Sequence, residues 1–361
     1  MFRRLLSALG FLASSISSRL PLELAQVIGP ELGSGSATQQ ATADSIDWHL
    51  RTSPLQTSQR FSLFARLYDL LEDGTLPRVW LRRRVSFVKK DNPLEAGEAF
   101  ALYKGKSKGR AVCIKVLRSS EARHMRRHIK DIVLRSYICH PNILQVIGIR
   151  LTRPQGLDVV TEYADRGSLR DYAPGLSQPE RLWLLIGALK GLAFLHSLGL
   201  VHGNLKGSNV VVTRDGRAVI SCLQTACLEK GSESSSLDFL APTSSFSPRW
   251  AAPERVGKDV IRPSKASDIW SFGCLLYEIL SSGIPFSEFD RDAQVVAALQ
   301  SDKHFLPRRP PIPGRDSCEA ICDPCWDLIM LCWERNPDNR PTCDELLQAC
   351  AHLQHREPDW D

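Results

Sequence analysis

The chain has 361 residues, 43% hydrophobic and 24% charged, which is enough for one large domain with tails or for two ordinary domains. Its net charge of +6 is small for this length, so we expect no nucleic-acid partner. No apolar run approaches the ~18 residues of a membrane-spanning helix, so we expect no transmembrane segment.

Residues 1–22 form a basic, apolar N-terminal segment that contains Arg3, Arg4 and Arg19 and no acidic residue. This composition fits an untargeted tail or docking helix, a mitochondrial presequence, or a weak secretory signal. Because many free cysteines are unusual in a secreted protein, we expect a cytoplasmic protein, with a mitochondrial location as the alternative.

The 11 cysteines are scattered through apolar segments and become denser over 318–350. We interpret them as free, mostly buried thiols in a reducing compartment. The densest group is Cys318, Cys322, Cys325 and Cys332, which contains one C-x-x-C pair. Because no second such pair follows, we favour ordinary thiols over a structural zinc site.

Residues 23–79 are predicted to form a linker and a short helical extension. Gly, Ser, Ala, Thr and Gln dominate 29–45, as in a linker, and apolar residues recur at threes and fours over 46–75, as in a helix. A basic run follows, which fits a solvated strand edge or an anion-binding patch. Its members are Arg82, Arg83, Arg84, Lys89 and Lys90.

Short β-like runs dominate from about 80 to 162, and helical patterns dominate from 163 to 355. The predicted strands are 84–88, 99–103, 111–117, 143–149 and 158–162, with one helix over 120–137. The later predicted helices are 179–198, 265–281, 292–301, 324–335 and 343–354. A small β-rich unit followed by a larger helical unit predicts an α+β fold with two lobes.

Six short motifs follow one another along this region, and their order is more specific than any one of them. They are Val-Cys-Ile-Lys at 112–115, His-Pro-Asn-Ile at 140–143, Val-His-Gly-Asn-Leu-Lys-Gly-Ser-Asn at 201–209, Ala-Pro-Glu at 252–254, Ser-Asp-Ile-Trp-Ser-Phe-Gly at 267–273, and a Cys-Trp-Glu to Arg-Pro-Thr segment at 332–342.

In this order the motifs resemble those of protein kinases over about 85–355. The last motif resembles the tyrosine-kinase-like group, and the loop at 201–209 is most similar to fungal members of that group. The resemblance implies a two-lobed protein-kinase domain over 80–355, with an N-lobe over about 80–162 and a C-lobe over about 163–355. It also implies that Glu254, Asp268 and Arg340 support the fold, with an ion pair between Glu254 and Arg340.

Two aspartates that the resemblance leads us to expect are replaced. Asn204 stands where a catalytic Asp accepts the hydroxyl proton of the substrate, and a neutral amide cannot take that proton. Cys222 stands where an Asp holds Mg²⁺, and a soft thiol is a poor ligand for that ion. We therefore expect no metal site, although Asn209, the second metal ligand of the family, is retained.

The phosphate-covering loop and its supporting pair are also altered. The three positions where the resemblance implies glycine are Glu95, Gly97 and Phe100, and Glu98 adds further negative charge. We favour an ordinary β-hairpin turn there. Asp131 takes the place of the helix Glu that pairs with Lys115, and its shorter arm makes the pair less secure.

Several nucleotide-binding positions are kept. Lys206 is retained, which fits either nucleotide binding or a structural ion pair. The resemblance implies an adenine pocket from Leu102, Cys113 and Val211. Lys115 and Asn209 would contact the phosphates, and the gatekeeper and hinge would be Thr161, Glu162, Tyr163 and Ala164. The retained residues are therefore compatible with ATP binding, whereas Mg²⁺ binding is not expected.

The function expected from this pattern is that of a kinase-domain signalling protein with impaired catalysis, a pseudokinase that acts as a scaffold or allosteric regulator. The alternative is a weak ATP-dependent serine/threonine kinase. Partners would be other signalling proteins or kinases, and the sequence does not fix the oligomeric state. A serine-rich stretch fits a disordered polar loop better than a phosphorylated one. Its serines are Ser232, Ser234, Ser235, Ser236, Ser244, Ser245 and Ser247.

Overall fold

The computed structural model describes residues 36–82, 85–88, 92–97, 99–119, 121–152, 156–229, 239–241, 246–256, 262–301, 305–310 and 321–355. The chain divides into two compact units. The first comprises Met1–Tyr137, Val146–Thr161 and Glu233–Phe239, and the second comprises Ile138–Gln145, Glu162–Ser232 and Leu240–Asp361. None of the helices described is both long and apolar enough to cross a bilayer.

The first unit is built on a six-stranded sheet in the order β1-β3-β4-β6-β5, with β2 also paired to β3. Its strands are β1 (Val85–Phe87), β2 (Glu95–Ala96), β3 (Phe100–Ser107), β4 (Arg110–Leu117), β5 (Val146–Thr152) and β6 (Gly156–Glu162). A turn at Lys108 and Gly109, both with positive φ, joins β3 to β4, as two-residue hairpins require. Val112, Ile114 and Val160 form the apolar core of this sheet.

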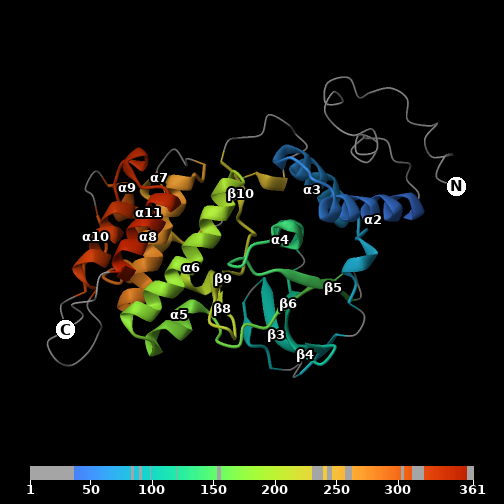
Figure 1. Cartoon of the computed structure of the whole chain (residues 1–361), viewed down its shortest axis with the longest axis horizontal. Coiled ribbons are helices and arrows are strands. Elements are labelled where there is room, and N and C mark those ends of the chain that lie inside the picture. The colour runs from blue at the N-terminus through green and yellow to red at the C-terminus, as the bar shows by residue number, and fades with distance from the viewer. Residues whose placement is uncertain are drawn as a thin grey trace, which may run out of the picture. The chain divides into compact units, whose positions relative to one another are not determined.

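Helix α4 (Ala122–Tyr137) packs against β4 and β5, and its second half is buried (Figure 1). Its apolar residues Ile129, Ile132 and Val133 are at most 1% exposed, which accounts for the helical periodicity in the sequence. The same half buries five polar side chains, which are His128, Lys130, Asp131, Arg135 and Ser136. Because a buried polar group without a hydrogen-bond partner destabilises the folded state, the contacts of these side chains are important for the stability of this unit.

An N-terminal pair of helices, α2 (Ser36–Thr52) and α3 (Thr57–Glu72), belongs to the first unit, and α3 packs on α4 (Figure 1). The linker predicted over 29–45 is therefore wrong for residues 36–45, which are helical. Burial explains the difference, because Ala43 and Ile46 are fully buried and outweigh the polar composition around them. Residues 1–35 lie outside the described residues.

A buried carboxylate joins this pair of helices to α4. Asp47 Oδ1 on α2 accepts hydrogen bonds from Trp80 Nε1 at 2.8 Å and from the Tyr137 hydroxyl at 2.7 Å. Arg51 Nε donates to both Asp47 oxygens at 3.0 Å, and the Phe64 ring stacks on Tyr137. This cluster fixes the C-terminal end of α4 and was not predicted from the sequence.

The second unit is mainly helical. Its helices are α5 (Leu169–Tyr172), α6 (Gln178–Ser197), α7 (Pro253–Val256), α8 (Lys265–Ser281), α9 (Asp292–Gln300), α10 (Asp323–Cys332) and α11 (Cys343–His355). Two small antiparallel pairs accompany them, formed by β8 (Val210–Val212) with β9 (Ala218–Ile220) and by β7 (Leu200–Val201) with β10 (Cys227–Leu228). Helix α8 is buried almost throughout, and α6 and α10 pack on it. The predicted α+β class is confirmed.

Candidate functional site

The loop at 202–209 is held by a buried carboxylate on α8. Asp268 Oδ2 accepts from the backbone N–H of His202 at 2.7 Å and from His196 Nε2 at 3.0 Å, and Oδ1 accepts from Gly203 N–H at 2.8 Å. Burial alone would raise the pKa of Asp268, but the hydrogen bond and charge of His196 lower it below its usual value. An ionised Asp268 therefore sets the shape of this loop.

Gly203 adopts the backbone conformation that the loop needs. Its φ is +78°, and a Cβ at this position would lie 3.1 Å from the carbonyl oxygen of Thr225. A side chain would be strained by the left-handed conformation and crowded by that oxygen. The positive φ and the nearby Thr225 oxygen therefore both favour glycine at position 203.

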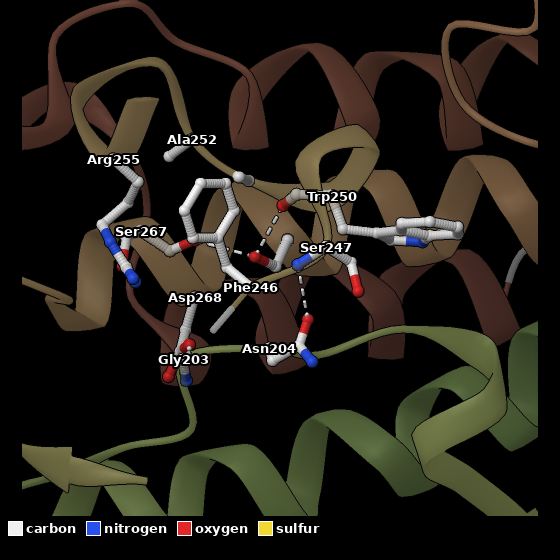
Figure 2. A pocket seen from close by; sticks show the side chains of 11 residues that line it. Gly203, Asn204, Phe246, Ser247, Trp250, Ala252, Arg255, Ser267 and Asp268 are labelled. Atoms are coloured by element: carbon white, nitrogen blue, oxygen red, sulfur yellow. Dashed lines mark hydrogen bonds between the residues drawn. The ribbon is translucent and has the colours of Figure 1, made fainter. Parts of the chain in front are cut away.

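Asn204 points its side chain at the segment that precedes α7 (Figure 2). Its Oδ1 accepts a hydrogen bond from the backbone N–H of Ser247 at 3.1 Å, and its backbone oxygen accepts from Asn209 Nδ2 at 2.8 Å. Together with Phe246 and Trp250 it lines a small pocket in the second unit. The Asn204 amide therefore binds backbone in this site, and it cannot serve as a proton acceptor at neutral pH.

Lys206 lies beside a buried structural cluster. Its Nζ is 5.7 Å from the centroid of the Trp250 ring, and Trp250 Nε1 donates to Glu278 Oε2 at 2.9 Å. The backbone N–H of Gly207 donates to the same Glu278 oxygen at 2.9 Å. Burial raises the pKa of Glu278. Lys206 therefore lies over the Trp250 ring, beside the buried Glu278.

Cys222 follows β9 and is partly exposed, and the next residue, Leu223, is fully buried. The other residue at the expected metal position is Asn209, whose backbone oxygen accepts from Ser221 N–H at 2.9 Å. One thiol and one amide do not make the hard oxygen site that Mg²⁺ requires. Within the described part of the chain, no group of three or more His, Cys, Asp or Glu residues is placed to hold a metal ion. The residues present therefore do not fit Mg²⁺.

In the first unit, Lys115 on β4 lies near one carboxylate and one aromatic ring. Its Nζ lies 3.7 Å from Asp131 Oδ2 on α4 and 4.5 Å from the centroid of the Phe100 ring. Asp131 also receives two hydrogen bonds from Arg135, at 2.8 Å and 2.6 Å. The Lys115–Asp131 pair therefore exists, but Asp131 is bound more closely by Arg135.

The loop between β2 and β3 is a tight hairpin. Glu95 pairs with Leu102, and the backbone N–H of Gly97 donates to the Phe100 oxygen at 2.8 Å. Glu98 lies outside the described residues. The Phe100 ring lies over Lys115 and 5.3 Å from the ring centroid of His128. The hairpin turn was expected from the sequence, but the approach of the Phe100 ring to Lys115 was not.

The remaining expected nucleotide-binding residues are divided between the two units. Leu102 lies opposite Lys115 on β3, and Cys113 lies on β4, where burial raises the pKa of its thiol to about 11. Thr161 is buried near the end of β6. In the second unit, Glu162 is exposed, and the next two residues, Tyr163 and Ala164, are partly exposed. Val211 pairs with Val219. Each side chain is thus placed within its own unit.

Glu254 and Arg340 are joined by two hydrogen bonds of 2.6 Å and 2.9 Å between guanidinium and carboxylate. Arg340 also donates to the Glu334 and Ala266 backbone oxygens and lies over the Trp270 ring. The Arg340 side chain is fully buried, and that of Glu254 is 11% exposed. Such a buried, two-pronged pair ties α7 to the segment before α11.

The cysteines near the C-terminus do not gather into a metal site within the described residues. Cys325 and Cys332 are buried, and Cys322 is partly exposed. Cys318 lies outside the described residues, as do Ser232, Ser234, Ser235, Ser236, Ser244 and Ser245.

Comparison with known proteins gives one family. Residues 88–350 match the family described as protein tyrosine and serine/threonine kinases. The chain is 29% identical over 268 residues to the serine/threonine/tyrosine-protein kinase HT1 of Arabidopsis thaliana, a match that covers 71% of this chain and 64% of that protein. It is 33% identical over 213 residues to a probable serine/threonine-protein kinase of Dictyostelium discoideum, covering 58% of this chain and 39% of that protein. The mitogen-activated protein kinase kinase kinase 3 of Arabidopsis thaliana is 33% identical over 223 residues, covering 61% of this chain and 34% of that protein. The chain thus spans less than two thirds of each of these relatives.

Proposed function

Because this chain belongs to the family of protein tyrosine and serine/threonine kinases, we propose that it is a pseudokinase, a member that has lost phosphotransfer and works as a scaffold or allosteric regulator. The observation that carries the proposal is Asn204. Its amide stands at the position of the catalytic base and accepts a hydrogen bond from the Ser247 backbone. The motifs suggest a place in the tyrosine-kinase-like group, nearest to fungal members.

Magnitudes support the loss of activity. A positioned general base contributes roughly 10²–10⁴ to a rate, which corresponds to about 3–5 kcal/mol. A metal ion that neutralises the transferring phosphate contributes several kcal/mol more. With Asn204 and Cys222 in these two positions, both contributions are missing, and the remaining rate is too low for signalling by phosphotransfer.

Nucleotide binding in this proposal is weak and independent of Mg²⁺. The charge of Lys115 already faces Asp131 and the Phe100 ring, so a phosphate group has to compete with both. ATP would be held by its base and by Lys115, with no contribution from a metal. The proposed partners are other signalling proteins or kinases, and the proposed location is the cytoplasm.

The test combines a phosphotransfer assay with a thermal-shift titration of the full chain, each with ATP in the presence and absence of Mg²⁺. We expect no phosphotransfer and no Mg²⁺-dependent rise in melting temperature, because a ligand raises it only by binding the folded state. The matched variants are Asn204→Asp, Cys222→Asp and the two together. Activity that appears only in the double variant identifies the natural chain as a degraded enzyme.

The alternative is a weak serine/threonine kinase, and the Lys115–Asp131 contact at 3.7 Å is the observation in its favour. Sustained Mg²⁺-dependent phosphorylation by the purified natural chain, abolished by Lys115→Ala, would refute the pseudokinase proposal and establish this alternative.

A further inference from the structure

Two cysteines begin helix α10 in the second unit. Cys322 is the residue that caps the helix, with an extended backbone (φ −60°, ψ 152°), and Cys325 is the third helical residue after Asp323 and Pro324. Helix geometry places Cα atoms three residues apart at about 5 Å, inside the ~4.4–6.8 Å range that a disulfide spans. The spacing of these two residues is therefore compatible with a disulfide between them.

The two thiols differ in exposure and interact with each other. Cys325 is 1% exposed, whereas Cys322 is partly open to solvent. A hydrogen bond from the Cys325 thiol lowers the pKa of Cys322 to about 7. The pKa of Cys325 is raised because its thiol donates to Cys322 and because it is buried. An accessible nucleophilic sulfur thus lies next to a protected one.

The charged groups around Cys322 act in opposite directions. Arg309 lowers its pKa and Asp323 raises it. Arg309 Nη2 donates to Asp323 Oδ1 at 2.5 Å and to the Ile321 backbone oxygen at 2.7 Å, and its guanidinium lies over the Trp326 ring. These contacts hold the cation beside the start of α10. The backbone N–H groups of a helix N-terminus add further positive potential there, which favours a thiolate.

We propose that Cys322 and Cys325 form a reversible, peroxide-sensitive dithiol. The Cys322 thiolate attacks the outer oxygen of a hydroperoxide, so that an S–O bond forms, the O–O bond breaks, and water or an alcohol leaves after protonation. The sulfur of Cys325 then attacks Cys322, an S–S bond forms, the S–O bond breaks, and hydroxide leaves as water with the proton of Cys325. Each sulfur is oxidised by one electron overall, and the peroxide is reduced. A dithiol reverses the change by exchange.

Other cysteines of the described part of the chain differ from this pair. Cys139 is exposed but donates to Gln145, and no cysteine lies near it in sequence. Cys332, Cys343 and Cys350 are buried, and burial raises the pKa of each thiol. An exposed nucleophile with a resolving thiol three residues away therefore distinguishes the start of α10.

The test uses the reduced full chain, treated with hydrogen peroxide, blocked with iodoacetamide and mapped by peptide mass spectrometry. We expect a Cys322–Cys325 disulfide, seen as the loss of two hydrogens from one peptide, which dithiothreitol restores. At pH 7, Cys322 should react with iodoacetamide about threefold faster than an ordinary thiol of pKa ~8.5, because its larger thiolate fraction outweighs its lower nucleophilicity.

Three variants separate the roles. Cys325→Ser should leave a sulfenic acid at Cys322 that dimedone traps, Cys322→Ser should leave Cys325 reduced, and Cys139→Ser should form the disulfide as the natural chain does. The proposal is overturned if Cys322 and Cys325 both stay reduced at a peroxide dose that oxidises Cys139, or if Cys322 pairs with a different cysteine. The mapping of the natural chain decides this even if a variant fails to fold, and neither result depends on whether the protein transfers phosphate.

Discussion

Replacing Asp47 by alanine should destabilise the first unit far more than its position outside the kinase-like motifs indicates. The carboxylate accepts from Trp80 Nε1 and the Tyr137 hydroxyl, and its residue is 5% exposed. A hydrogen bond to a charged group contributes about 1.5–3 kcal/mol, and a buried donor left without a partner costs about 1–3 kcal/mol. Because these terms overlap, we expect Asp47→Ala to lower the free energy of unfolding by about 3–5 kcal/mol.

The measurement is urea denaturation of the full chain together with hydrogen exchange of the α4 amides, which should lose protection. Asp69→Ala on the exposed side of α3 is the matched control, and a surface change of this kind stays within about 0.5 kcal/mol. Tyr137→Phe completes a double-variant cycle, in which we expect a coupling energy of about 1–2 kcal/mol. If Asp47→Ala and Asp69→Ala unfold at the same urea concentration, the carboxylate does not hold α4 and the reasoning fails.

Three further predictions concern single residues. His128 is buried and neutral, and burial lowers its pKa to about 4. Because His128 of the unfolded chain binds a proton near pH 6.5, the free energy of unfolding should fall by about 3 kcal/mol as the pH drops from about 6.5 to 4. The variant His128→Gln should flatten this part of the pH–stability curve. Gly203→Ala should cost about 1–3 kcal/mol in urea denaturation because of its φ of +78° and the nearby Thr225 oxygen, whereas Gly175→Ala, at an uncrowded glycine with ordinary φ, should cost less. Phe100→Ala should tighten Mg²⁺-free ATP binding about 2- to 30-fold in a thermal-shift titration, because it removes a cation–π contact with Lys115 that contributes about 0.5–2 kcal/mol. Unchanged binding would show that the Phe100 ring does not compete with phosphate for Lys115.

The elements that the sequence predicted well are those with strong local signals. Helix α8 was predicted over 265–281 and is found as Lys265–Ser281, because apolar residues recur along its whole length and Ser264 caps its first turn. The first part of helix α2, residues 36–45, was missed because its composition is that of a linker, whereas residues 46–52 fall within the helical pattern predicted over 46–75. Propensity is a weak guide in such a case, since tertiary burial decides.

The sequence predicted two contacts, the ion pair of Glu254 with Arg340 and the pair of Lys115 with Asp131, but not the surroundings of Asn204 and Cys222. The positions of Asn204 and Cys222 followed from motif order alone. The environment of Asn204 did not, because Ser247 lies 43 residues away along the chain. The Asp47 cluster was not predicted for the same reason, because Asp47 lies 90 residues from Tyr137. The approach of the Phe100 ring to Lys115 also depends on the β3–β4 register, which places Phe100 opposite Leu117, two residues beyond Lys115. Contacts of this kind arise from the fold and leave no local pattern.

The anchoring of the 202–209 loop by Asp268 has a consequence for how such proteins can change over time. The backbone of this loop is specified from α8 and α6, through His196 and Asp268, and none of these hydrogen bonds involves the side chain at position 204. The side chain at position 204 can therefore change while these hydrogen bonds persist, and the contact that depends on it is the one with the Ser247 backbone N–H. The substitution Asn204→Asp would therefore place a carboxylate in a loop whose backbone hydrogen bonds to Asp268 are already formed.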